Sequence, residues 1–354
     1  MKRNTVKNFL KTLVIVSALA ALSACGSKDQ ASTQAQNSVE SVGSLKVGVV
    51  GTSTRGGVYA LADKLGFYKE EGVKVELEHL GNPPEILAGL NEKKLDVSAF
   101  AITPQINSIG EGNDLVFIGG TGNIDERLFV LKENAEEYSK IDNLVGKKIA
   151  ADLSSAAEVA IKQDFEAAGY SYPDCVELTY YETGEAILQA IAKGDVDGGF
   201  LVVEMTSAAE RLGEQPILSF EDDVCCRQTV RRDTVDENRK ALVAFEIANI
   251  RALEYTISHK EDAVKILSDY SQLDKDEVDL EISFAEYLSV DPNKNSINTI
   301  YNDSLILGRN KEVDDINAHI DTSIYEEALN TLIEREPDNA TYKAYKENFE
   351  KNNK

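Results

Sequence analysis

Residues 65–75 read Leu65-Gly66-Phe67-Tyr68-Lys69-Glu70-Glu71-Gly72-Val73-Lys74-Val75, and the arrangement of the whole chain can be worked out from them. Gly66 and Gly72 mark the end of a helix and the turn after it, because glycine adopts backbone conformations that other residues avoid. From Val73 to Leu77 apolar and charged residues alternate, which is typical of a strand with one buried face. The stretch therefore predicts a helix end, a tight connection and a strand in close succession.

The same rules extend the pattern in both directions. Residues 45–50 are a short apolar run that predicts a buried strand. Apolar residues then recur at helical spacing, at Val58, Leu61, Ala62 and Leu65. Pro83-Pro84 opens a further helix, since proline is tolerated in a first turn, and residues 96–100 supply a third strand. Residues 45–100 thus predict a β-α-β-α-β unit.

The same order of elements returns after Gly146. We predict strands over residues 147–151, 176–181 and 199–203, and helices over residues 155–168 and 184–193. The turns before the last strand of each unit are alike, at residues 91–97 and 192–197. Any α/β chain gives such echoes, so an internal repeat and a chance likeness both stay open. The alternation itself predicts an α/β fold with largely parallel sheets and two lobes.

From Thr234 onward the chain is predicted to be mostly helical. Its first helix carries one apolar face, made of Leu242, Phe245, Ile250, Leu253 and Ile257. We expect this helix and those after it to cover the first lobe.

Four phrases carry a family resemblance, and together they span most of residues 45–232. They are residues 65–75; the helix, turn and strand of residues 86–100; Leu144-Val145-Gly146-Lys147-Lys148-Ile149-Ala150; and Gly194-Asp195-Val196-Asp197 followed by Glu204. With them the chain resembles the nitrate/sulfonate/bicarbonate-type substrate-binding proteins of ABC importers, a group that includes binders of thiamine precursors.

The resemblance implies a periplasmic-binding-protein type II fold, in which two α/β lobes are joined by a two-strand hinge. Lobe I would comprise residues 45–128 and 223–354, and lobe II residues 129–222. The chain would cross between them near residues 123–131 and 220–229. A small-molecule ligand would lie in the cleft, and lobe closure would signal to an ABC permease with its ATPase. A monomer is expected.

The N-terminus predicts export and lipid anchoring. Four basic residues precede an apolar run over residues 13–22, which is too short for an ordinary membrane span. The run ends in Leu22-Ser23-Ala24-Cys25, which resembles a bacterial lipobox. We expect residues 1–24 to be a signal peptide, Cys25 to carry the lipid, and residues 25–44 to be a flexible polar tether. An uncleaved anchor helix is the alternative, and the lipobox does not distinguish plasma from outer membrane.

Composition excludes several classes of protein. The net charge of −24 argues against a nucleic-acid partner, because phosphate backbones require lysine and arginine. Four cysteines make no disulfide framework, and three histidines without ligand spacing make no metal site. We therefore expect neither a metal nor a cofactor.

Candidate ligand-binding residues follow predicted strands, because ligands in open α/β sheets bind at the carboxyl ends of strands near helix N-termini. Side-chain and backbone donors that could meet a ligand there are Ser53, Thr54, Arg55, Asn82, Thr103, Ser154, Ser155 and Ala156. Arg55 could pair with a planar anion, or be a solvated surface arginine. Asn82 could be part of a plain turn, and Thr103, Ser154 and Ser155 could be helix caps.

Two further candidates complete the predicted site. The family resemblance implies an acidic residue beside the cleft, and Glu204 occupies that position. Cys226 lies with Cys225 at the predicted hinge. The two cysteines could line the pocket, form a vicinal disulfide or pack as small apolar residues.

No arrangement of nucleophile and base, metal cluster or phosphate loop has convincing spacing, so we expect binding without turnover and no enzyme. Two alternatives stay open. One is an enzyme similar to thiamine-pyrimidine synthase on the same fold, and the other is a lipid-anchored ligand sensor.

Overall fold

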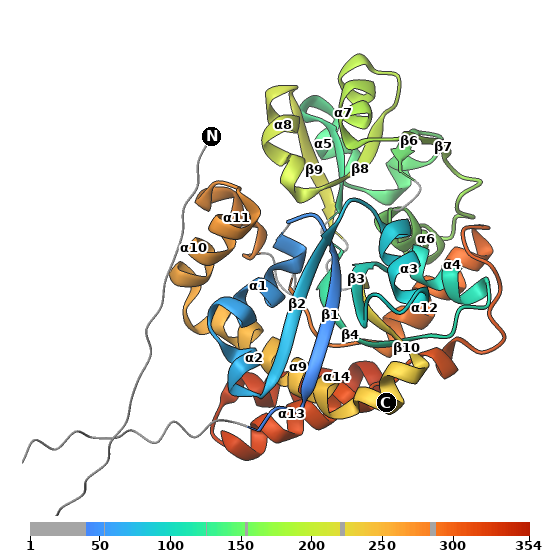
Figure 1. The fold of residues 1–354 in the computed structure, drawn as a ribbon. Coiled ribbons are helices and arrows are strands. Elements are labelled where there is room, and N and C mark those ends of the chain that lie inside the picture. Colours follow the sequence, from blue (N-terminus) through green and yellow to red (C-terminus); the bar gives the residue numbers. More distant parts are fainter. Residues whose placement is uncertain (1–39, 53, 125, 153–154, 220–223, 284–287) are drawn as a thin grey trace, which may run out of the picture. The chain divides into compact units, whose positions relative to one another are not determined.

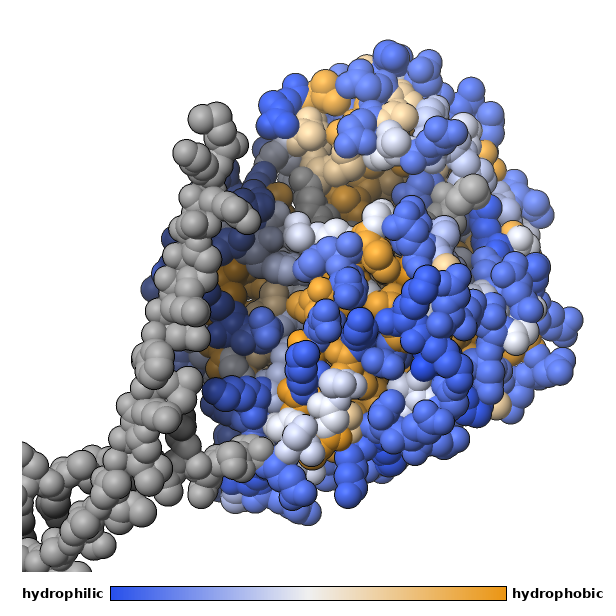
Figure 2. Space-filling model, viewed as in Figure 1, coloured by the Kyte–Doolittle hydropathy of each residue, from blue (hydrophilic) through white to orange (hydrophobic). Residues whose placement is uncertain are grey.

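A computed structural model describes residues 40–354, except residues 53, 125, 153–154, 220–223 and 284–287. The predicted signal peptide, Cys25 and most of the predicted tether lie outside the described residues. Residues Val39–Lys354 form one compact unit. Within the described part, none of the helices combines the length and apolar character that a membrane span requires. The face seen in Figure 2 is mostly hydrophilic, in keeping with the charged composition.

The first five-stranded sheet has the order β2-β1-β3-β10-β4 (Figure 1). Its first three strands are parallel, and β10 runs antiparallel to both neighbours. The strands are β1 (Gly43–Val50), β2 (Val73–Leu80), β3 (Val97–Ala101), β4 (Leu115–Asn123) and β10 (Val224–Arg231). The helices between them are η1 (Thr54–Gly56), α1 (Gly57–Lys64), α2 (Phe67–Glu70), α3 (Pro83–Asn91) and α4 (Ile102–Gly110).

The second sheet repeats this plan, with the order β7-β6-β8-β5-β9. Again three parallel strands are followed by an antiparallel fourth strand, here β5. The strands are β5 (Glu126–Leu131), β6 (Lys148–Ala151), β7 (Glu177–Tyr180), β8 (Gly198–Val202) and β9 (Glu214–Ser219). The helices are η2 (Lys132–Asn134), α5 (Ala135–Tyr138), η3 (Ile141–Leu144), α6 (Ala157–Ala167), α7 (Gly184–Lys193), η4 (Val203–Met205) and α8 (Thr206–Arg211). The predicted α/β class with two lobes is confirmed.

The internal repeat extends to hydrogen bonds. Asp96 accepts from the backbone N–H of Lys46 at 2.8 Å, and Asp197 accepts from that of Lys148 at 2.9 Å. Three residues before each aspartate the chain takes a positive φ, 58° at Lys93 and 73° at Gly194. The two turns that look alike in sequence therefore have the same structure.

The two crossings between the sheets are also related. The chain leaves the first sheet after β4 to form β5, and returns after β9 to form β10. Arg127 on β5 lies opposite Leu201 of β8, and Arg227 on β10 lies opposite the matching residue of β3, Phe100. Both arginines are buried, and each donates to the carbonyl oxygen of the residue before it. The fourth strand of each sheet thus carries a buried arginine at the same register. The predicted residue limits of the lobes stay a prediction.

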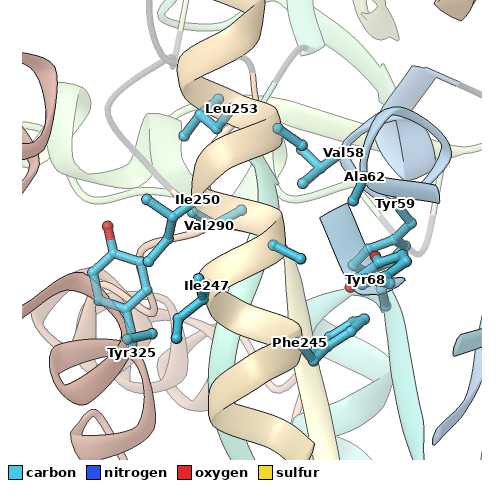
Figure 3. Close-up of a cluster of buried hydrophobic side chains, with 14 of the residues drawn as sticks. Val58, Tyr59, Ala62, Tyr68, Phe245, Ile247, Ile250, Leu253, Val290 and Tyr325 are labelled. Carbon is cyan, nitrogen blue, oxygen red and sulfur yellow. The ribbon is translucent and has the colours of Figure 1, made fainter. Parts of the chain in front are cut away.

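The C-terminal part is helical, as expected. Its elements are α9 (Arg232–Ser258), α10 (Lys260–Ser271), α11 (Lys275–Glu281), α12 (Lys294–Ile306), η5 (Ile316–His319), α13 (Ser323–Arg335) and α14 (Ala340–Asn353). Phe245 of α9 packs against Tyr59 and Tyr68, with ring centroids 5.4 and 5.6 Å away (Figure 3). On another side of α9, Figure 3 shows Tyr325 of α13 and Val290.

Two expectations about these helices need correction. Ile257 is 62% exposed, because the last turn of α9 extends past the core that buries the rest of the apolar face. The C-terminal segment also does not cover the first sheet alone. Lys162 of α6 pairs with Asp303 of α12 at 3.0 Å, and Glu158 of α6 pairs with Arg309 at 3.3 Å. These charges connect the C-terminal segment to a helix of the second sheet.

Candidate functional site

A cleft of about 600 Å³ lies at the carboxyl ends of strands from both sheets. Pro104, in the first turn of α4, borders it from the side of β3, and Asp152 follows β6 directly. The segment from Tyr180 to Gly184, which joins β7 to α7, supplies the rest of the lining. This is the edge at which open α/β sheets bind ligands.

Two tyrosines and two carboxylates set the chemistry of the cleft. Tyr180 and Tyr181 are half-buried, so their rings offer flat apolar surface to a ligand, while Glu182 is exposed. The guanidinium of Arg309 lies 4.1 Å from the centroid of the Tyr180 ring and stabilises its position. Asp152 adds a second carboxylate to the lining. The cleft therefore suits a ligand with a flat apolar part and hydrogen-bond donors.

Glu158 holds the hydroxyl end of the Tyr180 side chain. Its Oε1 accepts hydrogen bonds from the hydroxyls of Tyr172 at 3.2 Å and Tyr180 at 3.3 Å. Burial raises the pKa of Glu158, and the nearby Arg309 opposes that shift. Tyr180 is thus held by its hydroxyl on one side and by a stacked arginine on the other, so its ring is preorganised before a ligand arrives.

The start of α6, where Ser154, Ser155 and Ala156 were expected to bind a ligand, already holds a carboxylate. Oε2 of Glu126 accepts from the Ser155 hydroxyl at 3.1 Å and from the Ala157 N–H at 2.8 Å. The Ser155 oxygen in turn accepts from the N–H of Glu158. Ala156 is the buried N-cap residue of α6. An anion at a helix N-terminus is favourable, and here the chain supplies it from β5.

The first loop is organised by a contact with the C-terminal helices. Thr54 is buried and donates from its hydroxyl to Glu281 of α11. Arg55 lies in η1, and Ser53 and the side chain of Arg55 lie outside the described residues. The first loop therefore places Thr54 against a carboxylate of the chain itself.

Asn82 and Thr103 differ in their surroundings. Asn82 is the N-cap of α3 and accepts from the Glu85 N–H at 3.0 Å, so it is a helix cap and not part of the plain turn considered as the alternative. Thr103, in the first turn of α4, is buried, and its hydroxyl has no hydrogen-bond partner among the described residues. Its neighbour Pro104 borders the cleft. Thr103 is thus the predicted residue with an unused donor near the cleft.

The remaining candidates lie away from the cleft lining or outside the described residues. Ser154 is among the residues that the structure does not describe, and the side chain of Glu204, in η4, is not placed. Cys226 is buried in β10 with its Sγ 3.1 Å from that of Cys225.

Sequence reasoning overlooked the segment from Tyr180 to Gly184. It follows the predicted strand 176–181 and precedes the predicted helix at Gly184, so the rule that selected the other loops applies to it equally. Thr183 caps α7 by accepting from the Ala186 N–H. Two adjacent tyrosines at the end of a strand, ahead of such a cap, were the available signal.

Comparison with solved structures supports the fold. The chain is similar to the periplasmic aliphatic sulphonate binding protein SsuA from Escherichia coli, with a TM-score of 0.67, 18% identity, and coverage of 79% of this chain and 92% of that one. It is similar to the periplasmic nitrate-binding protein NrtA from Synechocystis PCC 6803, with a TM-score of 0.64, 14% identity, and coverage of 82% and 89%. The desulfurization enzyme DSZB also matches, with a TM-score of 0.54, 13% identity, and coverage of 81% and 99%.

At these identities the structural likeness shows the periplasmic-binding-protein fold. A comparison with curated protein sequences gives no match. The sequence itself fits one family model, described as NMT1/THI5 like, over residues 54–263, which is more than half of the chain. The chain is therefore a member of the NMT1/THI5-like family.

Proposed function

We propose that this protein is the extracytoplasmic solute-binding component of an ABC importer. It captures a small solute in the cleft bordered by Pro104, Asp152 and residues 180–184 and delivers it to a membrane permease and its ATPase. The observation that carries the proposal is the position of this cleft, at the carboxyl ends of strands from both sheets. Movement of one sheet relative to the other would open or close a site placed there.

The charges around the cleft favour a neutral or cationic organic solute. Asp152 and Glu182 line it, and Glu126 occupies the N-terminus of α6. A nitrate or sulfonate group would be repelled by these carboxylates, and the helix terminus that could compensate is already in use. The tyrosine rings instead suit an aromatic ring or a cationic amine. The Thr103 hydroxyl would add a donor or acceptor at the other edge.

The same proposal covers the ends and the assembly of the chain. Residues 1–24 direct export and Cys25 carries a lipid anchor. The tether ends at residue 42 and not at residue 44 as predicted, because Gly43 and Ser44 belong to β1. The protein is a monomer whose lobes divide near residues 128 and 223. Binding takes place without turnover. Membrane fractionation tests the anchor, because Cys25→Ser should release the protein from the membrane fraction.

Thermal unfolding against a ligand panel tests the cleft. The panel comprises nitrate, bicarbonate, an alkanesulfonate, aminopyrimidines, riboflavin and amino acids. A ligand at about 100 times its dissociation constant adds roughly 2.7 kcal/mol of stability, which raises the melting temperature by several degrees. We expect the hit among the ring-bearing or amine-bearing compounds, and recovery of that compound unchanged.

Matched variants locate the binding. Tyr181→Ala should abolish the shift, whereas Tyr170→Ala, which changes a tyrosine of the same lobe outside the cleft lining, should leave it intact. A shift with nitrate or the sulfonate would overturn the proposed ligand class alone. Conversion of the bound compound would overturn the transport role in favour of an enzyme.

A further inference from the structure

Two consecutive cysteines of β10 have their sulfur atoms in contact. Cys225 and Cys226 are both buried, and their Sγ atoms are 3.1 Å apart. In a regular strand successive side chains point to opposite faces, which keeps neighbouring thiols apart. The distance here is only about 1 Å longer than the roughly 2.05 Å of a disulfide bond. The local backbone must therefore differ from a regular strand.

The pairing of β10 with β4 shows that difference. Val224 lies opposite Asn123 and Cys226 opposite Gly122, so Cys225 is an extra residue with no counterpart on β4. A second shift in register follows between Cys226 and Arg227. Such a bulge redirects side chains and is common beside functional sites. In this strand it brings two neighbouring thiols to one side.

The pair lies where the chain passes between the two sheets. β10 belongs to the first sheet, yet both cysteines pack in an apolar cluster with Leu128 of β5 and Ala157 of α6, which belong to the second. The backbone is held on both sides of the pair. The Val224 N–H donates to the Ser296 hydroxyl at 3.0 Å, and the Cys226 carbonyl accepts from Arg227 at 2.8 Å. These hydrogen bonds hold the backbone that places the two thiols in contact.

We propose that Cys225 and Cys226 form a thiol–disulfide modification site at this crossing. One thiolate attacks an external small-molecule disulfide, forming a mixed disulfide and releasing one thiol. The neighbouring thiolate then attacks the cysteine sulfur of that mixed disulfide and releases the second thiol. The two cysteines lose two electrons and two protons, which the released thiols carry. A dithiol reductant reverses both steps, and the small ring between adjacent residues is strained, which makes its bond readily reducible.

Counting thiols tests this site in the full-length chain. Cys25→Ser leaves three cysteines, namely Cys175, Cys225 and Cys226. The folded protein is treated with oxidised glutathione, quenched in acid, unfolded, alkylated with N-ethylmaleimide and weighed. We expect one alkylated cysteine per chain instead of three. The intact mass should equal that of the reduced and fully labelled chain minus two labels and two hydrogen atoms. Dithiothreitol should restore all three.

Single variants identify the partners. With Cys175→Ser added, oxidation should still remove two alkylatable thiols, whereas with Cys225→Ser or Cys226→Ser no bond within the chain should form. A peptide covering residues 212–227 should carry the linkage. Three alkylated thiols after oxidation, a bond that includes Cys175, or a bond between two chains would each overturn the proposal.

Discussion

The two crossings between the sheets have the same framework and different chemistry. Each begins the antiparallel fourth strand of a sheet, and each carries a buried arginine at the same register, Arg127 on β5 and Arg227 on β10. The residue before the arginine differs. Glu126 accepts a hydrogen bond from the N-terminus of α6, whereas the sulfur of Cys226 contacts that of Cys225. The two crossings therefore share a backbone arrangement, and the residue before the arginine determines which side-chain contacts each crossing makes.

The two arginines also differ in how their charges are balanced. Arg227 is fully buried and donates to the Gly122 carbonyl at 2.8 Å and to Oδ1 of Asn123 at 2.7 Å. Burial lowers its pKa to about 10, and the charge of Asp291 opposes that shift. Asp291 belongs to the C-terminal segment, for which the second sheet has no counterpart in the repeat. The C-terminal segment, which supplies Asp291, thus helps to accommodate a fully buried arginine in the first sheet.

The largest expected effect comes from removing the deeper arginine. Arg227→Met leaves Asp291 and three backbone or amide acceptors without their cation. Breaking such a buried arrangement costs about 3–5 kcal/mol. Arg127→Met is the matched change in the other crossing and should cost less. Urea unfolding at neutral pH measures both. Equal losses would mean that Asp291 and the C-terminal segment contribute nothing specific to the burial of Arg227 on β10.

A second expected effect depends on pH and compares two buried glutamates, Glu246 of α9, which contacts Gln228 of the first sheet, and Glu214 of β9 in the second sheet. Burial raises the pKa of Glu246 on α9 well above its ordinary value, and raises that of Glu214 at the start of β9 to about 7. Above about pH 4.3 the unfolded chain has lost a proton that the folded chain keeps. The free energy of unfolding therefore falls as pH rises, by up to about 1.4 kcal/mol per pH unit for each group.

Glutamine substitution removes these slopes separately. Relative to the unmodified chain, Glu246→Gln should gain stability as the pH rises above about 5, because burial raises the pKa of this carboxyl. The gain of Glu214→Gln should stop growing near pH 7, where the folded group itself loses its proton. Denaturation curves across this range measure both. Parallel curves for Glu246→Gln and the unmodified chain would show that this carboxyl is not protonated in the fold.

The smallest expected effect tests the repeated turn. Asp96→Asn and Asp197→Asn each weaken a charge-assisted hydrogen bond to a backbone N–H, and we expect about 1 kcal/mol for each. Asp197 also accepts from the Tyr138 hydroxyl at 3.2 Å, so Tyr138→Phe should be made in both backgrounds. If the turns are equivalent, the two losses agree once the tyrosine contact is removed. The free energy of unfolding from urea titrations decides this.

Much of the fold follows from local pattern. The strands around Val47 and Ile149 and the helix from Gly184 to Lys193 appear where the apolar spacing predicts them, because their burial depends on residues near in sequence. The likeness of the two turns also reflects local hydrogen bonds. Contacts between distant residues carry no such signal. No residue near Ser155 in the sequence indicates that its hydroxyl will donate to Glu126. Likewise, no residue near Glu246 indicates that this glutamate will be buried.

The predicted ligand-binding residues stay a prediction, and the structure shows which contacts several of them make within the chain. The strand ends are correct as places for a cleft, but Asn82 is used as a helix cap and Thr54 contacts Glu281. Side chains at such positions serve either the backbone or a ligand, and the sequence does not distinguish the two uses. Tyr180 shows the converse, since its role depends on Glu158 and Arg309, which lie far from it in the chain.

The fourth strand of the first sheet, β10, comes after all the strands of the second sheet in the chain, and this affects the order in which the two sheets can be completed. The second sheet is complete once residues 126–219 are present, whereas the first sheet, although it begins the chain, lacks its inner strand until β10 has emerged at residues 224–231. Pairing β10 with β3 closes a loop of more than a hundred residues, which is a slow step for a chain. The lobe that starts first during synthesis therefore finishes last, and until then the open edge of β3 is exposed to other chains.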